Sequence, residues 1–396
     1  MAVRAALRQV LSEWSLPRAA KAVRARDLRG LPIGDPGPDA AILAGLSWLK
    51  RAQDQSRTHD GGFARDFSLL TGWATSYPET SGYIVPTLLR EAGAQGDDDL
   101  RRRAARCLDW LVSIQFPEGG FQGGRVDQVP RVPVTFNTGQ ILLGLAAGAR
   151  FLGRDKYLGP MQRAAAWLRD TQDEDGCWRR HSTPFSHAGE KAYETHVAWG
   201  LFEAARAAAG EGFGEAGLRQ VRWAMTKQHT NGWLESNCLE DPKAPLTHTI
   251  GYALRGFVEA HLFANDRAIL EAAHRMADGL LPAIAIDGRL AGRLDEEWRP
   301  TVDWACLTGS AQIAHSLFLL ARISQRPDYV VKARLLNAYV RRSMSTMGEV
   351  DTLGGIKGSF PVHGDYGRYQ YLNWACKFTI DSCREELVFA SSQSSQ

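Results

Sequence analysis

The sequence predicts an all-α protein, a single-domain (α/α)6 toroid of six helical hairpins, and three observations lead to that prediction. A glycine-containing turn recurs six times along the 396 residues. A short polar segment containing threonine recurs with the same period. Each repeat also holds one amphipathic and one almost wholly apolar stretch. Repeats of this length are typical of arrays of helical hairpins.

The recurring turn joins glycine to an apolar residue. It reads GGF at 61–63 and 119–121, GCW at 176–178, NGW at 231–233, DGRL at 287–290 and GGI at 354–356. The last residues of successive turns lie 58, 57, 55, 57 and 66 positions apart. Six units of nearly constant length indicate one structural unit repeated around the molecule.

A second marker follows each of the first five turns and opens the apolar stretch of that repeat. It reads ETSGY at 79–83, NTGQI at 137–141, ETHVA at 194–198, HTIGY at 248–252 and LTGSA at 307–311. The sixth repeat has NWACK at 373–377 and lacks the threonine. Because both markers share one period, the repeat does not depend on either alone.

Two kinds of helix are expected in each repeat. Residues 98–115 are charged on one face and apolar on the other, whereas residues 138–152 are apolar all round after a polar start. A helix that is apolar on every face has to be buried on every face. Six amphipathic helices around six buried ones form two concentric rings. An open solenoid is the alternative, and the uniformly apolar second helices favour the closed ring.

Composition sets the boundaries of the expected domain and the class of protein. We expect a basic N-terminal extension over 1–36, the toroid over 37–384 and a disordered tail over 385–396. A net charge of +3 is too small to argue for nucleic acid or a membrane surface as partner, and no nucleic-acid partner is expected. The N-terminal segment lacks the apolar core of a secretory signal, and no stretch is long enough to span a membrane. Six scattered cysteines without a CxxC pair favour a reducing, cytoplasmic location.

The turns also carry a resemblance. Three segments, Gln115 to Phe121, Gln172 to Trp178 and Gln228 to Trp233, resemble the QW motif of terpenoid cyclases and the turns of protein prenyltransferase β subunits. In that motif the glutamine caps a helix end and stacks on the aromatic ring, so the resemblance implies fold and not chemistry. The segments 245–256, 302–315 and 358–378 resemble toroid proteins associated with bacterial polysaccharide biosynthesis, which implies glycan chemistry without naming a reaction.

Candidate functional residues come from one register position, the residue before each repeat threonine. Structural positions of a repeat tend to stay the same, whereas these residues differ while the threonine beside them stays. The six residues at this position are Glu79, Asn137, Glu194, His248, Leu307 and Asn373. Other polar or aromatic candidates lie within a turn or two, namely Tyr77, Tyr193, His196, Tyr252, Arg255, Asp303 and Lys377. Each has a structural alternative, such as an acid that complements a helix N-terminus.

The chemistry that these residue types offer is acid–base catalysis. Glu79 and Glu194 are predicted catalytic carboxylates that suit a glycosidase if they face each other across the cavity. Alternatively, His248 or His196 with Tyr252 abstracts a proton beside a uronic carboxylate, as in a lyase or epimerase. Asn137 and Arg255 would then hold that carboxylate. The remaining predicted substrate-binding residues are Tyr193, His196, Asp303 and Asn373. The expected ligand is an acidic oligosaccharide.

Isoprenoid chemistry and a non-catalytic glycan-binding toroid are the alternatives. The chain has no DxDD motif, and its nearest acidic run, 173–175, lies in a QW-like turn. Asp303 and Cys306 supply only two ligands of a zinc site, so no metal is expected. The sequence also lacks a glycine-rich phosphate loop and a serine nucleophile elbow, and no cofactor is expected.

Overall fold

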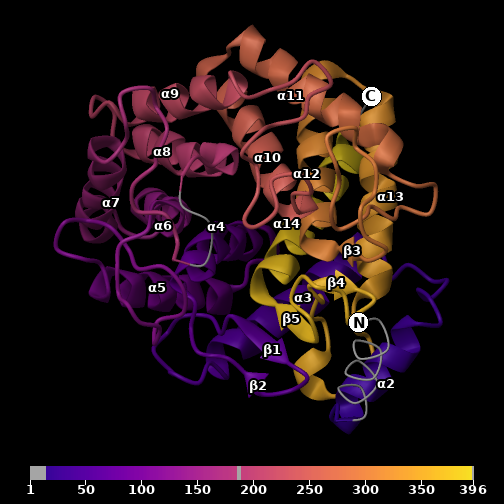
Figure 1. Ribbon diagram of the computed structural model, residues 1–396. Coiled ribbons are helices and arrows are strands. Elements are labelled where there is room, and N and C mark those ends of the chain that lie inside the picture. The colour runs from indigo at the N-terminus through magenta and orange to yellow at the C-terminus, as the bar shows by residue number, and fades with distance from the viewer. Residues whose placement is uncertain (1–14, 185–188, 395–396) are drawn as a thin grey trace, which may run out of the picture.

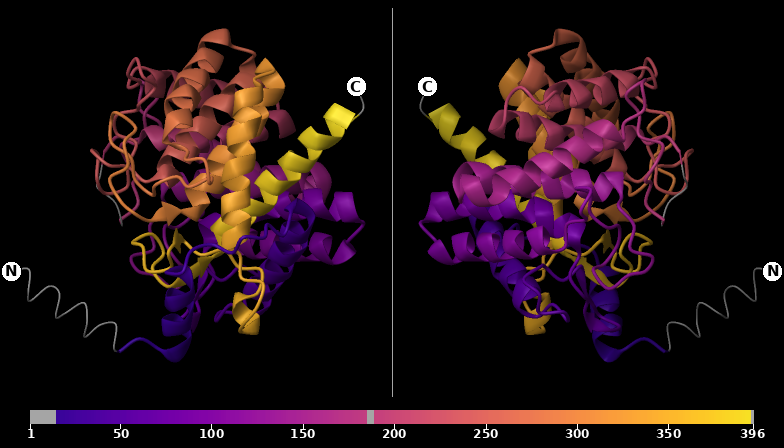
Figure 2. Two further views of the ribbon diagram at one scale, coloured as in Figure 1. Left: turned by 90° about the vertical axis from the view of Figure 1, so that its right-hand side faces the viewer. Right: turned by 90° about the vertical axis from the view of Figure 1, so that its left-hand side faces the viewer.

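The computed structural model describes residues 15–184 and 189–394. Six helices form the inner ring: α4 (Pro78–Gln95), α6 (Thr135–Phe151), α8 (Thr195–Ala207), α10 (Thr247–Ala264), α12 (Leu307–Ser324) and α14 (Asn373–Ser394). Six form the outer ring: α3 (Pro38–Asp54), α5 (Asp98–Ser113), α7 (Arg154–Asp170), α9 (Phe213–Met225), α11 (Arg267–Leu280) and α13 (Pro327–Ser343). The predicted (α/α)6 toroid is confirmed (Figures 1 and 2).

The ring is closed and not an open arc. Each inner helix packs on the next, and α14, the last inner helix, packs on both α3 and α4, the first two helices of the ring. The expected openings of the inner helices near 79, 137, 194, 248, 307 and 373 all coincide with helix starts to within two residues. Inner helices such as α12 are buried along almost their whole length, which is why their sequences are apolar on every face.

The glycine turns tie each hairpin to its neighbour. The first glycine of each of the six turns has a positive φ angle, for example 87° at Gly232 and 79° at Gly354. A Cβ at Gly232 would overlap the carbonyl oxygen of Arg275 in α11, and one at Gly354 would overlap that of Ala44 in α3. The last turn therefore touches the first outer helix, which closes the ring with the same contact that links the other repeats.

The glutamines of the QW-like segments bridge neighbouring repeats. The amide nitrogen of Gln172 donates to the carbonyl oxygens of Gly176 and Ala216, each at 2.9 Å, and its oxygen accepts from Arg219 at 2.7 Å. Gln115 and Gln228 form the same pattern with their own turns and the following outer helices. These residues are structural, as the resemblance implied.

Two short sheets, which the sequence analysis did not predict, connect distant repeats. The first has the order β2-β1-β5, with β1 (Asp66–Ser68), β2 (Gly72–Trp73) and β5 (Gln370–Leu372). The second pairs β3 (Ala305–Cys306) with β4 (Ser359–Phe360). Three 3-10 turns complete the list: η1 (Ala192–Glu194), η2 (Leu281–Ala283) and η3 (Val350–Thr352). Antiparallel pairing of β1 with β5 joins the first repeat to the sixth.

The two ends of the chain differ in how they match the expected boundaries. Within the predicted extension 1–36, helix α2 (Arg18–Asp27) docks through Asp27, which accepts from Lys357 at 2.6 Å; residues 1–14 lie outside the described residues. The disordered tail predicted over 385–396 is wrong as far as residue 394, because α14 continues to Ser394 and extends past the ring (Figure 2). Glu385 pairs with Arg322 of α12, and Glu386 pairs with Arg341 of α13. These ion pairs hold the beginning of the segment 385–394 against the ring.

None of the helices among the described residues is long and apolar enough to cross a membrane.

Candidate active site in the toroid cavity

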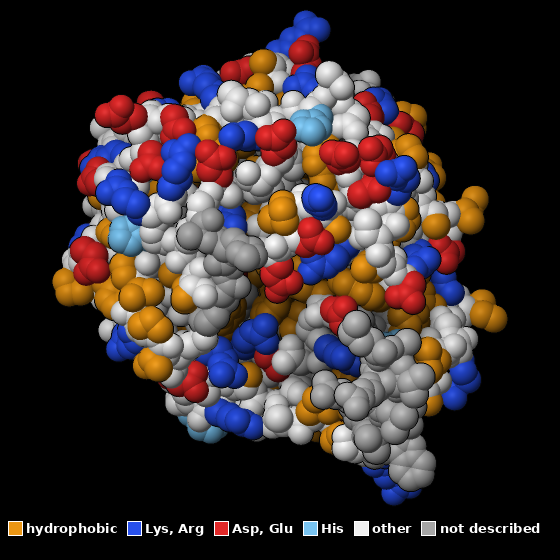
Figure 3. Space-filling view, in the orientation of Figure 1, with side chains coloured by type: hydrophobic (Ala, Val, Ile, Leu, Met, Phe, Trp, Pro, Cys, Tyr) orange, Lys and Arg blue, Asp and Glu red, His pale blue; other side chains and the backbone are white. Residues whose placement is uncertain are grey.

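A cavity of about 560 Å³ lies at the N-terminal ends of the inner helices. Figure 3 shows a hollow near the centre of this face, with charged side chains at its edge. The residues that line the cavity and carry polar or aromatic side chains include Arg65, Asp66, Trp73, Tyr77, Glu79, Tyr83, Phe136, Asn137, Tyr193, His248, Tyr252, Tyr366 and Trp374. Five of the ten predicted site residues are among them: Glu79, Asn137, Tyr193, His248 and Tyr252.

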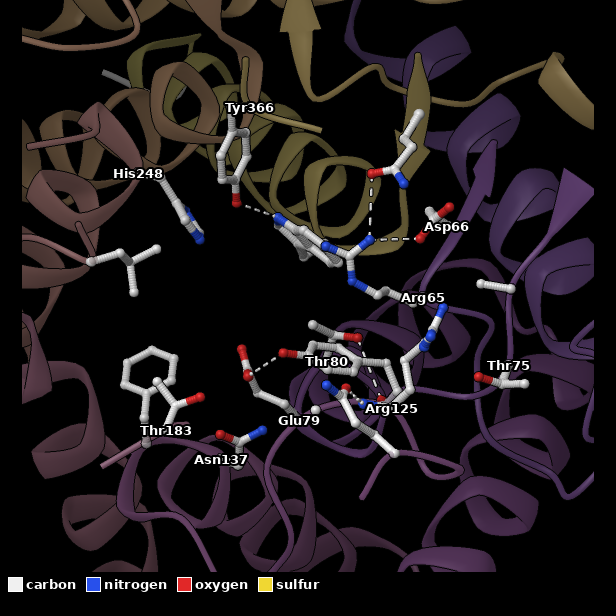
Figure 4. A pocket seen from close by; sticks show the side chains of 18 of the residues that line it. Arg65, Asp66, Thr75, Glu79, Thr80, Arg125, Asn137, Thr183, His248 and Tyr366 are labelled. Carbon is white, nitrogen blue, oxygen red and sulfur yellow. Dashed lines mark hydrogen bonds and ion pairs between the residues drawn. The ribbon is translucent and has the colours of Figure 1, made fainter. Parts of the chain in front are cut away.

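Glu79 is the second residue of α4 and points into the cavity (Figure 4). Pro78 starts the helix, where its missing N–H costs nothing. The Glu79 carboxylate accepts a hydrogen bond from the Tyr77 hydroxyl at 3.0 Å. Burial raises the pKa of Glu79 to about 7, although the Tyr77 hydrogen bond and the charge of Arg65 oppose the rise. Near neutral pH this carboxyl can therefore both give and take a proton.

His248 occupies the equivalent place in α10, the second residue of the helix, and its ring also points into the cavity (Figure 4). Its Nδ1 lies 2.8 Å from the side-chain oxygen of Gln312 in α12. An amide oxygen only accepts, so Nδ1 carries the proton and Nε2 keeps its lone pair. Burial lowers the pKa of His248 to about 4. The imidazole is therefore neutral at physiological pH and is available as a proton acceptor.

Arg65 is a cavity residue that the sequence analysis missed. It directly precedes β1, and its Nη1 donates to Asp66 at 2.7 Å and to Gln370 of β5 at 3.4 Å. Its guanidinium lies 5.1 Å from the ring centre of Trp374 and 5.9 Å from that of Tyr77. Figure 4 shows the other edge of the guanidinium turned toward the cavity. A planar fork held in this way is suited to a carboxylate.

Aromatic side chains form much of the remaining wall. The ring of Tyr252 lies 4.3 Å from that of His248, and the hydroxyl of Tyr252 lies 3.5 Å from that of Tyr83. Tyr366 accepts a hydrogen bond from the indole nitrogen of Trp374 at 2.7 Å. Burial raises the pKa of Tyr252 well above its ordinary value, so this phenol keeps its proton. Flat aromatic faces with polar tips are common in sites that bind sugar rings.

The other five predicted site residues do not line the cavity, and two of them come from the start of α8. Glu194 belongs to η1, just before the helix, and is buried away from the cavity. Burial raises its pKa well above the ordinary value. His196 is fully buried and bonds through Nδ1 to the side-chain oxygen of Gln140 at 2.7 Å. Glu194 therefore does not line the cavity with Glu79, and the pairing of the two carboxylates stays a prediction.

The remaining three predicted residues also lie outside the lining of the cavity, each at a position set by its own element or by another interaction. Arg255 lies below the cavity, where it pairs with Glu259 at 2.7 Å. Asp303 is exposed on the loop before β3, outside the cavity. Asn373 is fully buried at the start of α14 and donates to the carbonyl oxygen of Ala64 at 2.9 Å. The role of every predicted site residue stays a prediction.

No group of three or more His, Cys, Asp or Glu side chains able to hold a metal ion occurs in residues 15–184 and 189–394.

Comparisons with known proteins agree on the fold. A family model for the squalene-hopene cyclase C-terminal domain matches residues 85–259. Among curated proteins, a squalene–hopene cyclase of Zymomonas mobilis subsp. mobilis is 25% identical over 231 residues, which is 52% of this chain. The chain spans only 33% of the length of that relative.

Solved structures with different activities are similar over most of the chain. An unsaturated glucuronyl hydrolase specific for heparin has a TM-score of 0.71 at 16% identity, covering 90% of this chain and 99% of its own. A D-mannose isomerase has a TM-score of 0.70 at 10% identity, covering 89% and 97%. The cellobiose 2-epimerase of Bacillus thermoamylovorans has 0.67 at 11%, covering 86% and 96%. These likenesses, with the closed double ring of helices, show that the chain is an α/α-toroid protein.

Proposed function

We propose that this protein is an enzyme that processes an acidic glycan or oligosaccharide by acid–base chemistry in the toroid cavity. The observation that carries the proposal is the pairing in one cavity of two differently tuned groups, the Glu79 carboxyl and the neutral His248 imidazole. Both stand at the same helical position on different inner helices. Environments that push the pKa values of neighbouring groups in opposite senses are typical of acid–base catalysts.

The roles follow from what each group can donate or accept. His248 Nε2 takes a proton from a sugar carbon next to a carbonyl or carboxylate group. The negative charge that then develops on the oxygen of this carbonyl or carboxylate group is stabilised by the guanidinium of Arg65. Glu79, whose pKa burial raises to about 7, returns a proton to carbon or gives one to a leaving oxygen. Tyr252 stays protonated and donates a hydrogen bond to the same substrate.

This assignment favours epimerisation, isomerisation or elimination over hydrolysis by two carboxylates. A hydrolytic pair needs a second carboxylate opposite the first, and Glu194, the expected partner of Glu79, does not line the cavity. Structures of epimerases and of a sugar isomerase are among those with the same fold. Unsaturated glucuronyl hydrolases are also among them, which supports a substrate that carries a carboxylate.

Isoprenoid cyclisation is the second candidate. It is favoured by the match to the squalene-hopene cyclase model over 85–259 and by the aromatic cavity wall, which would stabilise a carbocation. Against it, the acidic run at 173–175 lies in an outer turn, where Asp173 and Asp175 pair with Arg179 at 3.0 and 2.7 Å. The cavity itself presents Glu79, Arg65 and His248, a polar set better suited to a sugar acid.

The location and partners of the protein are proposed from composition. All six cysteines are free and buried, which supports a reducing, cytoplasmic compartment. The net charge of +3 gives no support for nucleic acid as a partner.

The test is a substrate panel followed by proton NMR in deuterated water. The panel contains uronate-bearing di- and tetrasaccharides, their unsaturated and neutral counterparts, and a linear polyprenyl substrate. We expect solvent deuterium to enter an acidic sugar, or a double bond to form in it, with wild-type protein. Glu79→Gln and His248→Ala should each reduce the rate by roughly 100-fold or more, the usual range for a general acid or base.

Glu194→Gln is the matched control, because it removes a buried carboxyl from the same repeat register but outside the cavity. It should keep the activity if it folds. Turnover of the polyprenyl substrate, or equal loss of activity in the folded Glu194→Gln and Glu79→Gln variants, would contradict the proposal.

A further inference from the structure

Aromatic side chains close the toroid directly below the cavity. Tyr83, Tyr252 and Phe378 come from three different inner helices, one turn deeper than Glu79, His248 and Trp374. The ring of Phe378 lies 5.3 Å from that of Tyr83 and 6.1 Å from that of Tyr252. Tyr83 has no exposed surface at all. These rings form a floor across the axis of the toroid.

Below the floor, charged side chains fill the axis. Lys377 is 2% exposed, and its ammonium lies 5.0 Å from the ring centre of Tyr83 and 2.8 Å from Asp381. Asp381 also accepts from Arg90 at 2.6 Å and from Thr87 at 2.7 Å. These side chains come from α4 and α14, the first and last inner helices, which contact each other where the ring closes.

The same layer continues on α10 and α12. Arg255 pairs with Glu259 at 2.7 Å and approaches Nδ1 of His315 at 3.0 Å, and its guanidinium lies 4.2 Å from the ring centre of Trp199 in α8. His315 and Glu259 are 5% and 6% exposed. Each charge has an opposite partner or a ring face, so the layer is a packed plug with no path for a sugar chain.

The rim of the cavity is formed by the loops that precede five of the six inner helices. Arg57 and Thr75 come from the segment before α4, Arg125 and Asp127 from that before α6, Thr183 from that before η1 and α8, and Glu240 from that before α10. Tyr366 and Gln370 precede α14. A mouth bordered by five of the six repeats is a pit and not a groove that runs across the molecule.

We propose that this pit binds the end of a glycan chain, so that the enzyme acts on a terminal sugar and never on an internal one. The inference rests on the proposed function and names its substrate more closely. An internal sugar could reach Glu79 and His248 only if the chain entered and left through the same mouth as a hairpin, because the floor and the plug block the far side. A terminal sugar needs only one strand in the mouth. The cavity volume of about 560 Å³ is in the range of pockets for small ligands and not of polymer clefts.

The experiment uses one uronate-containing hexasaccharide in four forms. The first is free at both ends, the second is reduced to the alditol at its reducing end, the third is methylated on its terminal non-reducing sugar, and the fourth is blocked at both ends. Wild-type protein is assayed by NMR and mass spectrometry for the position of the altered sugar, with Glu79→Gln as the inactive control. We expect the free form and one singly blocked form to react. The form blocked at both ends should react at least about 100-fold more slowly, the cost of displacing a substrate from its catalytic geometry.

Reaction at internal sugars of the doubly blocked hexasaccharide would overturn this inference and leave the proposed function standing. If wild-type protein alters none of the four forms, the proposed function fails, and saturation-transfer NMR with the same hexasaccharides then tests the pit alone. Contact confined to a terminal sugar supports it. Equal contact along the chain, or no binding of any form, overturns it.

Discussion

Replacing Glu79 by Gln should stabilise the protein in a pH-dependent way, and this signature needs no substrate. The Glu79 carboxyl is 8% exposed and has a pKa of about 7 in the folded chain, against 4.5 for the free side chain. Folding therefore favours the protonated form. As the pH rises from 4.5 to 7, the unfolded chain loses this proton and the folded chain holds it, so the stability of the wild type falls over that window. The amide introduced by Glu79→Gln cannot ionise, so the stability of the variant does not fall over this pH window for that reason.

The magnitude follows from the two pKa values. Between pH 5 and pH 8, linkage gives a relative loss of about 2.5 kcal/mol for the wild type. A chain of 396 residues has an unfolding entropy of about 0.8 kcal/mol/K at about 2.1 cal/mol/K per residue. The difference in melting temperature between Glu79→Gln and wild type should therefore grow by about 3 °C from pH 5 to pH 8.

Calorimetry of both proteins at the two pH values measures this difference directly. Glu271→Gln is the control, because the Glu271 side chain is 54% exposed in a surface ion pair and such pairs contribute little. The difference in melting temperature between Glu271→Gln and wild type should change by less than about 1 °C from pH 5 to pH 8, as expected for an ion pair that contributes under about 1 kcal/mol. A Glu79→Gln difference that is the same at pH 5 and pH 8 would refute the argument that burial dominates at Glu79.

Three further predictions concern the scaffold. Trp178→Ala should cost about 3–5 kcal/mol, or about 4–6 °C in melting temperature, because Trp178 is 1% exposed and donates to the Leu168 carbonyl at 2.8 Å; a variant that melts like wild type but is inactive would contradict the structural role. Gly232→Ala should destabilise by about 2–4 kcal/mol in urea titrations, because it combines positive φ with overpacking, whereas Gly96→Ala, also at positive φ but with open space around its Cβ position, should lose only about 1–2 kcal/mol; equal losses would argue against the clash. Asp381→Asn should cost about 3–5 kcal/mol because it removes the carboxylate that pairs with the buried ammonium of Lys377, and Lys377→Met combined with Asp381→Leu should cost less; urea titration showing the opposite order would argue against the plug.

The fold was predictable because its signals are local and repeated. The first glycine of each turn has a conformation that other residues avoid, and the inner helices are largely apolar after a polar start, so one repeat could be checked against five others. Residues such as Gly232 and Trp178 are visible in the sequence for that reason. The pairing of β1 with β5 was not predictable. It joins Asp66 to Leu372 across about 300 positions, and strands of two or three residues have no periodicity to detect.

The unpredicted sheet explains why Arg65 was missed. Nothing in the local sequence distinguishes this arginine from those on the surface. Its place in the cavity depends on Gln370 of β5 and on Trp374 of α14, which reach it only when the ring closes. The segment 358–378, which contains Tyr366 and Trp374, was noted for its resemblance to other toroids. That resemblance and the register residue Asn373 were signals pointing to this side of the cavity, and neither pointed to Arg65.

Five of the ten predicted site residues line the cavity. Their positions relative to the start of each inner helix differ from those of the predicted residues that do not. The residue before the repeat threonine is the second residue of α4 at Glu79 and of α10 at His248, and the third of α6 at Asn137. All three line the cavity. In contrast, Glu194 precedes the first residue of α8 and Asn373 is the first residue of α14. Each residue along a helix turns the side chain by about 100°.

A sequence register therefore fixes a side chain's direction only if every helix begins at the same point of the repeat. The inner helices begin between three residues before the threonine, in α6, and the threonine itself, in α8. Glu194 lies in the 3-10 turn η1 directly before α8, whereas Glu79 lies in the first α-helical turn of α4, and only Glu79 lines the cavity. Within α4 the direction of the side chains is regular. Tyr83 and Thr87 follow Glu79 at intervals of four residues, so they lie on the same face of the helix, where Tyr83 contacts Tyr252 of the floor and Thr87 contacts Asp381 of the plug. The start of each inner helix thus differs between repeats, so the repeat register alone does not tell which side chains line the cavity.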